Sequence, residues 1–128
     1  KAKTFPATAN FASRNASLLQ EIHDSLLDRA AKLREAHTVK IETKDDFIAF
    51  FTAKNAAKPE IHGGFALAHW DGSAEVEAEI KEQLKVTIRC IPIGGAEGTP
   101  WEKSLTEDGP CVMCGRPGKG RVVFAKSY

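Results

Sequence analysis

The sequence predicts an α/β protein of the α+β kind, a two-layer sandwich in which helices pack on one face of a small mixed sheet. Two observations lead to this prediction. Segments with apolar residues every three or four positions alternate with short segments that are apolar throughout or at every second position. The 128 residues also suffice for one domain with one core. The expected order is helix, strand, helix, strand, helix, strand, loop, strand.

A long helix is expected first, from about Ser17 to His37. Its apolar face repeats every three or four residues, at Leu19, Ile22, Leu26, Ala30 and Leu33. Charged side chains occupy the opposite face, where Asp28 and Lys32 form an i,i+4 pair. Residues 1–15 carry little pattern, so we expect a lead-in or linker there and the domain itself over residues 16–128.

A short strand and a second helix are expected next. Val39 and Ile41 alternate with polar residues, which is typical of a half-buried strand. Thr43 is placed to cap the following helix, and Asp46 lies three residues later in its first turn. Phe47, Phe50 and Phe51 are predicted to form the buried face of this helix.

The middle of the chain predicts a strand, a turn, a helix and another strand. Residues 65–68 are apolar throughout, as in a strand covered on both faces. Residues 71–73, Asp-Gly-Ser, are a turn signal. The third helix has an apolar face at Val76, Ile80 and Leu84. In the strand that follows, Val86, Ile88 and Cys90 alternate with polar residues, so Cys90 is expected to be a small buried apolar residue.

The composition changes between residues 94 and 120. Seven of the ten glycines lie there, with Pro100, Pro110 and Pro117. Glycine and proline at this density predict a loop. Regular structure is expected to return as a last strand over residues 121–125.

Composition excludes several classes of protein. The longest apolar run, residues 47–51, is far shorter than the roughly 20 residues that a membrane-spanning helix needs. The first twenty residues lack the apolar core of a signal peptide. Three cysteines do not make a disulfide framework. We therefore expect no membrane association and a reducing, cytoplasmic location.

The end of the chain is basic. Residues 109–128 contain Arg116, Lys119, Arg121 and Lys126 and no acidic residue, whereas the rest of the chain is mildly acidic. A basic end on an acidic body is consistent with contacts to phosphate or another anionic partner. A solvated, flexible end would carry the same composition, and both interpretations stay open.

Cys111 and Cys114 form a Cys-x-x-Cys-Gly turn, which is half of a structural zinc site. A complete site needs two further ligands, and His69, at the end of the second strand, could contribute one. Cys90 is expected to be a buried apolar residue instead. The alternative is a tight turn with two reduced thiols. A thioredoxin-like redox pair is disfavoured because the motif does not open a helix after a first strand. No spacing of histidine, serine and acidic residues predicts a catalytic site.

Four segments together resemble a known family. They are residues 63–72 (GGFALAHWDG), 86–92 (VTIRCIP), 111–117 (CVMCGRP) and 121–128 (RVVFAKSY). The segments resemble the C-terminal domain of proline–tRNA ligase (prolyl-tRNA synthetase) of the archaeal and eukaryotic type, which some bacteria also have. The resemblance covers roughly residues 16–128, and its upstream part is less specific.

The resemblance implies a longer parent enzyme. Its catalytic domain would bind ATP and Mg²⁺, activate proline and transfer it to tRNA(Pro). An anticodon-binding domain would follow, and the parent would be a homodimer. The C-terminal domain packs on these domains in the family, and its terminal carboxylate, here that of Tyr128, points toward the active site. Because the chain begins at Lys1 and its only methionine is Met113, we expect a C-terminal piece that has no catalytic activity alone.

The resemblance also bears on the metal site. Zinc-bearing members of the family supply two more cysteines from the loop after the second strand. Residues 70–75 of this chain, Trp-Asp-Gly-Ser-Ala-Glu, contain none. We therefore expect Cys111 and Cys114 to be the remains of a degenerate site without tightly held zinc. Two other functions stay open, a basic module that contacts tRNA and a small free-standing metal or redox protein.

Overall fold

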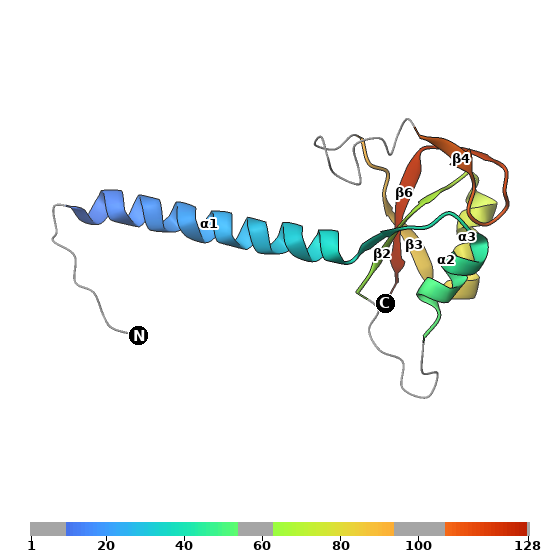
Figure 1. Cartoon of the computed structure of the whole chain (residues 1–128), viewed down its shortest axis with the longest axis horizontal. Coiled ribbons are helices and arrows are strands. Elements are labelled where there is room, and N and C mark those ends of the chain that lie inside the picture. The colour runs from blue at the N-terminus through green and yellow to red at the C-terminus, as the bar shows by residue number, and fades with distance from the viewer. Residues whose placement is uncertain (1–9, 54–62, 94–106, 128) are drawn as a thin grey trace. The chain divides into compact units, whose positions relative to one another are not determined.

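Figure 1 shows the computed structural model of the chain, which describes residues 10–53, 63–93 and 107–127. The chain divides into two compact units, Lys1–Ala36 and His37–Tyr128. Helix α1 (Phe11–Ala36) belongs to the first unit and begins before the predicted Ser17. Ala12 and Ala16 favour helix strongly, although they add nothing to the apolar pattern. The lead-in predicted for residues 1–15 is therefore helical from Phe11.

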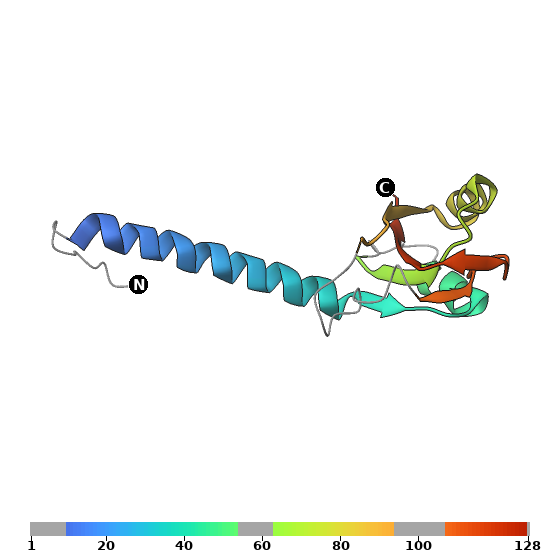
Figure 2. The same cartoon turned by 90° about the horizontal axis from the view of Figure 1, so that it is seen from above.

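The second unit contains the predicted mixed sheet. Its strands are β1 (Thr38–Lys40), β2 (Phe65–His69), β3 (Val86–Cys90) and β6 (Arg121–Lys126). Their order across the sheet is β1-β2-β6-β3. Strand β1 runs parallel to β2, and β6 runs antiparallel to both of its neighbours. The last strand of the sequence therefore lies in the middle of the sheet (Figure 2).

Helices α2 (Lys44–Phe51) and α3 (Ala74–Leu84) cover one face of this sheet, as predicted (Figure 1). The core between the layers joins the apolar faces of both helices to alternate residues of β2 and β6. Phe47 meets Phe124 of β6 edge to face, with the ring centroids 5.0 Å apart. The fully buried residues of this core include Phe47 and Phe51 of α2, Ile80 of α3 and Val86 of β3.

The predicted start of α2 is confirmed. The Thr43 hydroxyl accepts a hydrogen bond from the Asp46 N–H at 3.2 Å and donates one to the Asp46 carboxylate at 2.7 Å. The prediction for Cys90 was wrong, because this residue is exposed. The register of β3 against β6 shifts between Ile88 and Cys90, which breaks the alternation of buried and exposed positions.

The predicted loop over residues 94–120 contains a hairpin. Strands β4 (Asp108–Pro110) and β5 (Pro117–Lys119) pair with each other outside the main sheet. Glycine and proline make both segments poor strands by propensity. Gly118 is needed for packing, since a Cβ there would lie 2.6 Å from the carbonyl oxygen of Trp70. Residues 94–106 lie outside the described residues.

None of the helices among the described residues is long and apolar enough to cross a membrane.

Candidate functional site

The Cys-x-x-Cys motif forms the tight turn between β4 and β5. The Cys111 N–H donates to the Arg116 carbonyl at 2.8 Å, and the Gly115 N–H donates to the Cys111 carbonyl at 2.9 Å. Gly115 has a φ of +71°, a left-handed conformation that suits glycine. The Val112 N–H donates to the His69 carbonyl at 3.0 Å. These bonds hold both thiols beside the end of β2.

The segment that follows β2 presents a carboxylate to this turn. Asp71 accepts hydrogen bonds from Ser73, at 3.2 Å from the backbone N–H and at 2.9 Å from the hydroxyl. Its side chain is only 6% exposed. These hydrogen bonds fix the orientation of the Asp71 carboxylate.

Asp71, Cys111 and Cys114 form a cluster of metal-ligating groups. One donor atom from each residue lies within 4.8 Å of the other two. Cys111 is buried and Cys114 is exposed. The Cys114 thiol lies 3.6 Å from Asp71 Oδ2. The structure thus confirms that the two cysteines are close, and it adds a carboxylate that the sequence analysis placed only in a turn.

The remaining candidate ligand, His69, and the third cysteine, Cys90, lie elsewhere. His69 is buried, and its Nε2 lies 2.8 Å from the carbonyl oxygen of Glu107. Cys90 is exposed on β3. Neither residue belongs to the cluster found among residues 10–53, 63–93 and 107–127.

Arg116 closes the cluster with a positive charge. Its Nη2 lies 2.5 Å from Asp71 Oδ2 and donates to the Ser73 hydroxyl at 3.1 Å. The hydrogen bond with Cys114 and the charge of Asp71 raise the pKa of Arg116. Burial acts to raise the pKa of Asp71, but the Ser73 hydrogen bonds and the Arg116 charge outweigh it and the pKa is lowered. Burial raises the pKa of the Cys111 thiol.

The donor set does not fit a closed structural zinc site. Such a site takes four ligands, usually cysteine and histidine. The described part of the chain brings together two thiols and one carboxylate, and Arg116 already pairs with that carboxylate. The expectation that zinc is not tightly held remains a prediction.

At the basic end of the chain, the three basic side chains that the structure describes each make an internal contact. The Arg116 side chain is 58% exposed but pairs with Asp71. Lys126 donates to the Leu84 carbonyl at 2.6 Å. Lys119 lies in β5, and its side chain is outside the described part of the structure. Only 2% of the Arg121 side chain is exposed, which conflicts with its predicted contact to phosphate.

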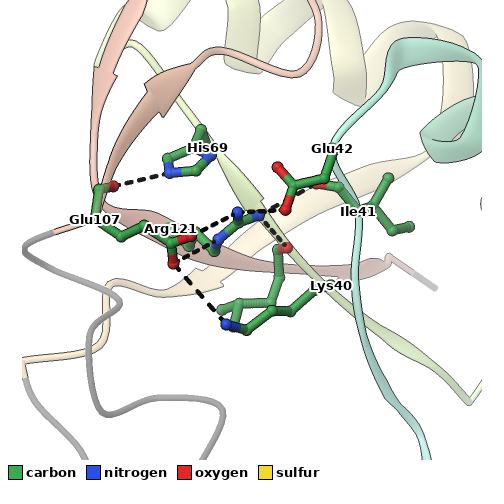
Figure 3. Close-up of polar contacts among 7 residues, drawn as sticks. Lys40, Ile41, Glu42, His69, Glu107 and Arg121 are labelled. Carbon is green, nitrogen blue, oxygen red and sulfur yellow. Dashed lines mark hydrogen bonds and ion pairs between the residues drawn. The ribbon is translucent and has the colours of Figure 1, made fainter.

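Figure 3 shows what holds Arg121. Its Nη2 lies 2.5 Å from Glu42 Oε1 and 3.0 Å from Glu107 Oε1, and its Nε donates to Glu107 Oε2 at 3.1 Å. Its Nη1 lies 3.4 Å from the carbonyl oxygens of Ile41 and Leu67. The guanidinium is thus occupied by two carboxylates and two backbone oxygens.

This network ties together elements that are far apart in the sequence. It joins the residues after β1, strand β2, the start of β6 and the residue before β4. The hydrogen bond from Arg121 lowers the pKa of Glu107, and Lys40, 3.9 Å away, adds to the effect. This site was not predicted from the sequence. A single arginine that opens an apolar strand was the available signal, because a buried charge needs a partner.

Residues 54–128 match the family described as prolyl-tRNA synthetase, C-terminal. The chain belongs to this family. The fold described above is therefore that of a prolyl-tRNA synthetase C-terminal domain.

Individual relatives of the chain are proline–tRNA ligases, in line with the family match. Proline–tRNA ligase 2 of Anaeromyxobacter dehalogenans is 50% identical over 116 residues, which are 88% of this chain and 21% of that protein. Proline–tRNA ligase of Christiangramia forsetii is 39% identical over 126 residues, which are 98% of this chain and 22% of that protein. The chain therefore spans about a fifth of the length of these relatives.

A solved structure shows the same fold. It is prolyl-tRNA synthetase from Cryptosporidium parvum complexed with L-proline and AMP. The TM-score is 0.68 at 20% sequence identity, over 99% of this chain and 24% of that chain.

In this prolyl-tRNA synthetase C-terminal domain, the last described residues are tied to the end of α3. The Ser127 N–H donates to the Lys85 carbonyl at 2.7 Å. Lys126 caps the Leu84 carbonyl, and Arg89 donates to the Lys126 carbonyl. Tyr128 lies outside the described residues, so its role at a parent active site stays a prediction.

Proposed function

We propose that the chain is the C-terminal accessory domain of a proline–tRNA ligase, an enzyme that attaches L-proline to tRNA(Pro) at the expense of ATP. The match of residues 54–128 to the family carries this proposal. The domain stabilises and positions the parent and performs no chemistry itself. ATP, Mg²⁺, proline and tRNA would be bound by the catalytic and anticodon-binding domains that precede it.

We further propose that the parent is a cytoplasmic homodimer of the archaeal and eukaryotic type. The last segment of the chain, Phe-Ala-Lys-Ser-Tyr, supports the type. Residues 1–15 would then link the anticodon-binding domain to a C-terminal domain at 16–128.

In this proposal the terminal carboxylate of Tyr128 reaches toward the active site of the parent. The anchoring of Lys126 and Ser127 to the end of α3 supports it, because these bonds fix the chain one residue before its end.

Replacement of the corresponding domain in a complete relative tests the proposal. The matching 116 residues of the Anaeromyxobacter dehalogenans enzyme would be deleted, or replaced by this chain with or without Tyr128. We expect the deletion to lower proline-dependent aminoacylation and the replacement to restore it. We expect the form without Tyr128 to restore protein stability but not the rate.

Two results would contradict the proposal. The first is a replaced enzyme that is folded and dimeric but no more active than the deletion. The second is proline-dependent pyrophosphate exchange by the 128-residue chain alone. A gel shift with tRNA examines the alternative of a tRNA-contacting module, which requires binding that weakens steeply with salt. The internal pairing of Arg121 and Lys126 disfavours that alternative.

A further inference from the structure

We propose that the Arg116 guanidinium takes the place of a metal ion at the Cys-x-x-Cys turn. Its removal would turn Asp71, Cys111 and Cys114 into a site for one thiophilic divalent cation, Zn²⁺ or Co²⁺. This inference concerns the residues of this chain alone and does not depend on the proposed function.

The three donor atoms form a suitable site on chemical grounds. They lie within 4.8 Å of one another and come from two segments about forty residues apart. Two cysteine sulfurs and one carboxylate oxygen are ligands that zinc accepts, and cobalt takes the same kinds of donor. The hydrogen bonds from the Ser73 backbone N–H and hydroxyl hold Asp71 in place, as outer hydrogen bonds do for ligating carboxylates in metal sites.

The Arg116 guanidinium occupies the position in which a metal ion would contact Asp71. Its Nη2 is 2.5 Å from Asp71 Oδ2, the oxygen that also lies 3.6 Å from the Cys114 sulfur. The cation therefore contacts the carboxylate that a metal would need. The turn itself places Arg116 there, because the Arg116 carbonyl accepts the Cys111 N–H at 2.8 Å.

Electrostatics then explains why a metal is not required. The guanidinium neutralises the Asp71 carboxylate, which is only 6% exposed. A divalent cation would have to displace this charge or sit beside it, and like charges repel at such distances. Because the Arg116 side chain is 58% exposed, water and salt screen the repulsion. We therefore expect the remaining repulsion to make the native chain bind a metal ion more weakly than a chain without Arg116 would.

Cobalt titration of the reduced, metal-free 128-residue chain tests the proposal. The proteins compared are the native chain, Arg116→Gln, Arg116→Lys as the charge-preserving control, and Arg116→Gln with Cys114→Ser as the donor control. We expect Arg116→Gln to bind one equivalent of Co²⁺ with a thiolate-to-cobalt absorption band, about tenfold or more tightly than the native chain. Arg116→Lys should resemble the native chain, and the double variant should lose the band.

Equal cobalt affinity in the native chain and Arg116→Gln would overturn the proposal, as would a folded Arg116→Gln that shows no band. A second measurement needs no variant. The thermal midpoint of the native chain should be the same with one equivalent of Zn²⁺ as with a chelator, because a ligand present near or below its dissociation constant stabilises little. A clear rise with stoichiometric zinc would mean that the native site holds metal, and the proposal would fail.

Discussion

The Arg121 guanidinium lies 2.5 Å from the Glu42 carboxylate, and the two residues are 79 positions apart in the sequence. Arg121 opens β6 in the middle of the sheet, whereas Glu42 follows β1 at its edge. The edge strand β1 pairs with β2 alone within the sheet. The ion pair therefore reaches across β2 and fastens the edge of the sheet to its centre.

Removal of Glu107 should destabilise the domain more than removal of Glu42. Glu107 accepts two hydrogen bonds from Arg121, and Glu107→Gln would leave a buried guanidinium with only part of its partners. We expect Glu107→Gln to lower the free energy of unfolding by about 1–3 kcal/mol. Because Glu42 is 60% exposed, Glu42→Gln should cost less than about 1 kcal/mol. Urea unfolding of the 128-residue chain measures both.

Glu79→Gln is the matched control. Glu79 pairs with Lys44 at 4.0 Å, and both side chains are exposed. An exposed pair of this kind contributes little. A cost for Glu107→Gln no larger than that for Glu79→Gln would show that the buried network does not stabilise the fold.

Stability should fall in acid, with Glu107 as one cause. The hydrogen bond from Arg121 holds the pKa of Glu107 below its ordinary value of 4.5 in the folded chain. The stabilisation is therefore fully present above pH 4.5 and is lost as the pH falls through the lower pKa of the folded state. The pKa of Asp71 is also lowered, so Asp71 contributes in the same direction.

The pH dependence is measured as the free energy of unfolding between about pH 7 and pH 3. Glu107→Gln cannot lose a carboxylate charge, so its stability should fall less steeply below pH 4.5 than that of the native chain. Parallel curves for the two proteins would contradict this assignment.

The hairpin should not tolerate a side chain at Gly118. A Cβ there would lie 2.6 Å from the Trp70 carbonyl oxygen and 3.4 Å from that of Gly109. Backbone atoms cannot rotate away, so Gly118→Ala should lower the free energy of unfolding by about 1–3 kcal/mol. Gly63→Ala is the control, because nothing lies within 4 Å of its added Cβ. Equal midpoints of thermal unfolding for the two variants would contradict the close packing.

The parts of the fold that follow from local rules were predictable. The cap at Thr43 and the buried face of α3 at Val76, Ile80 and Leu84 depend on residues a few positions apart, and both are confirmed. The hairpin was missed because tertiary packing of Gly118 against Trp70, rather than strand propensity, explains it. Cys90 was misplaced because a register shift leaves no mark on the alternation of residues.

The candidate site was likewise predictable only where it depends on residues close together in the sequence. The proximity of Cys111 and Cys114 follows from their separation by only two residues. Asp71 joins them only because the Val112 N–H binds the His69 carbonyl and brings the turn to the end of β2. Arg116 and Arg121 looked alike as basic residues near the end of the chain. Their surroundings differ. The Arg116 side chain is largely exposed, whereas Arg121 is buried among carboxylates that are distant in sequence.

Glycine at position 85 should stabilise the domain. Lys85 follows the last residue of α3 as its C-cap and has a φ of +55°, and it is the one residue other than glycine with a positive φ among those described. A left-handed conformation costs a side-chain-bearing residue free energy that glycine does not lose. We expect Lys85→Gly to raise the free energy of unfolding by about 0.5–1 kcal/mol. We also expect slower hydrogen exchange at the Ser127 amide, which donates to the Lys85 carbonyl.

Two comparisons make this prediction specific. Lys85→Val should destabilise the domain, because a β-branched side chain fits the left-handed conformation poorly. Lys81→Gly, inside the same helix, should cost about 1 kcal/mol through helix propensity. If Lys85→Gly were as destabilising as Lys81→Gly, the result would contradict the left-handed conformation of Lys85 at the end of α3. The anchor that holds Ser127 next to the end of the chain would then need another explanation.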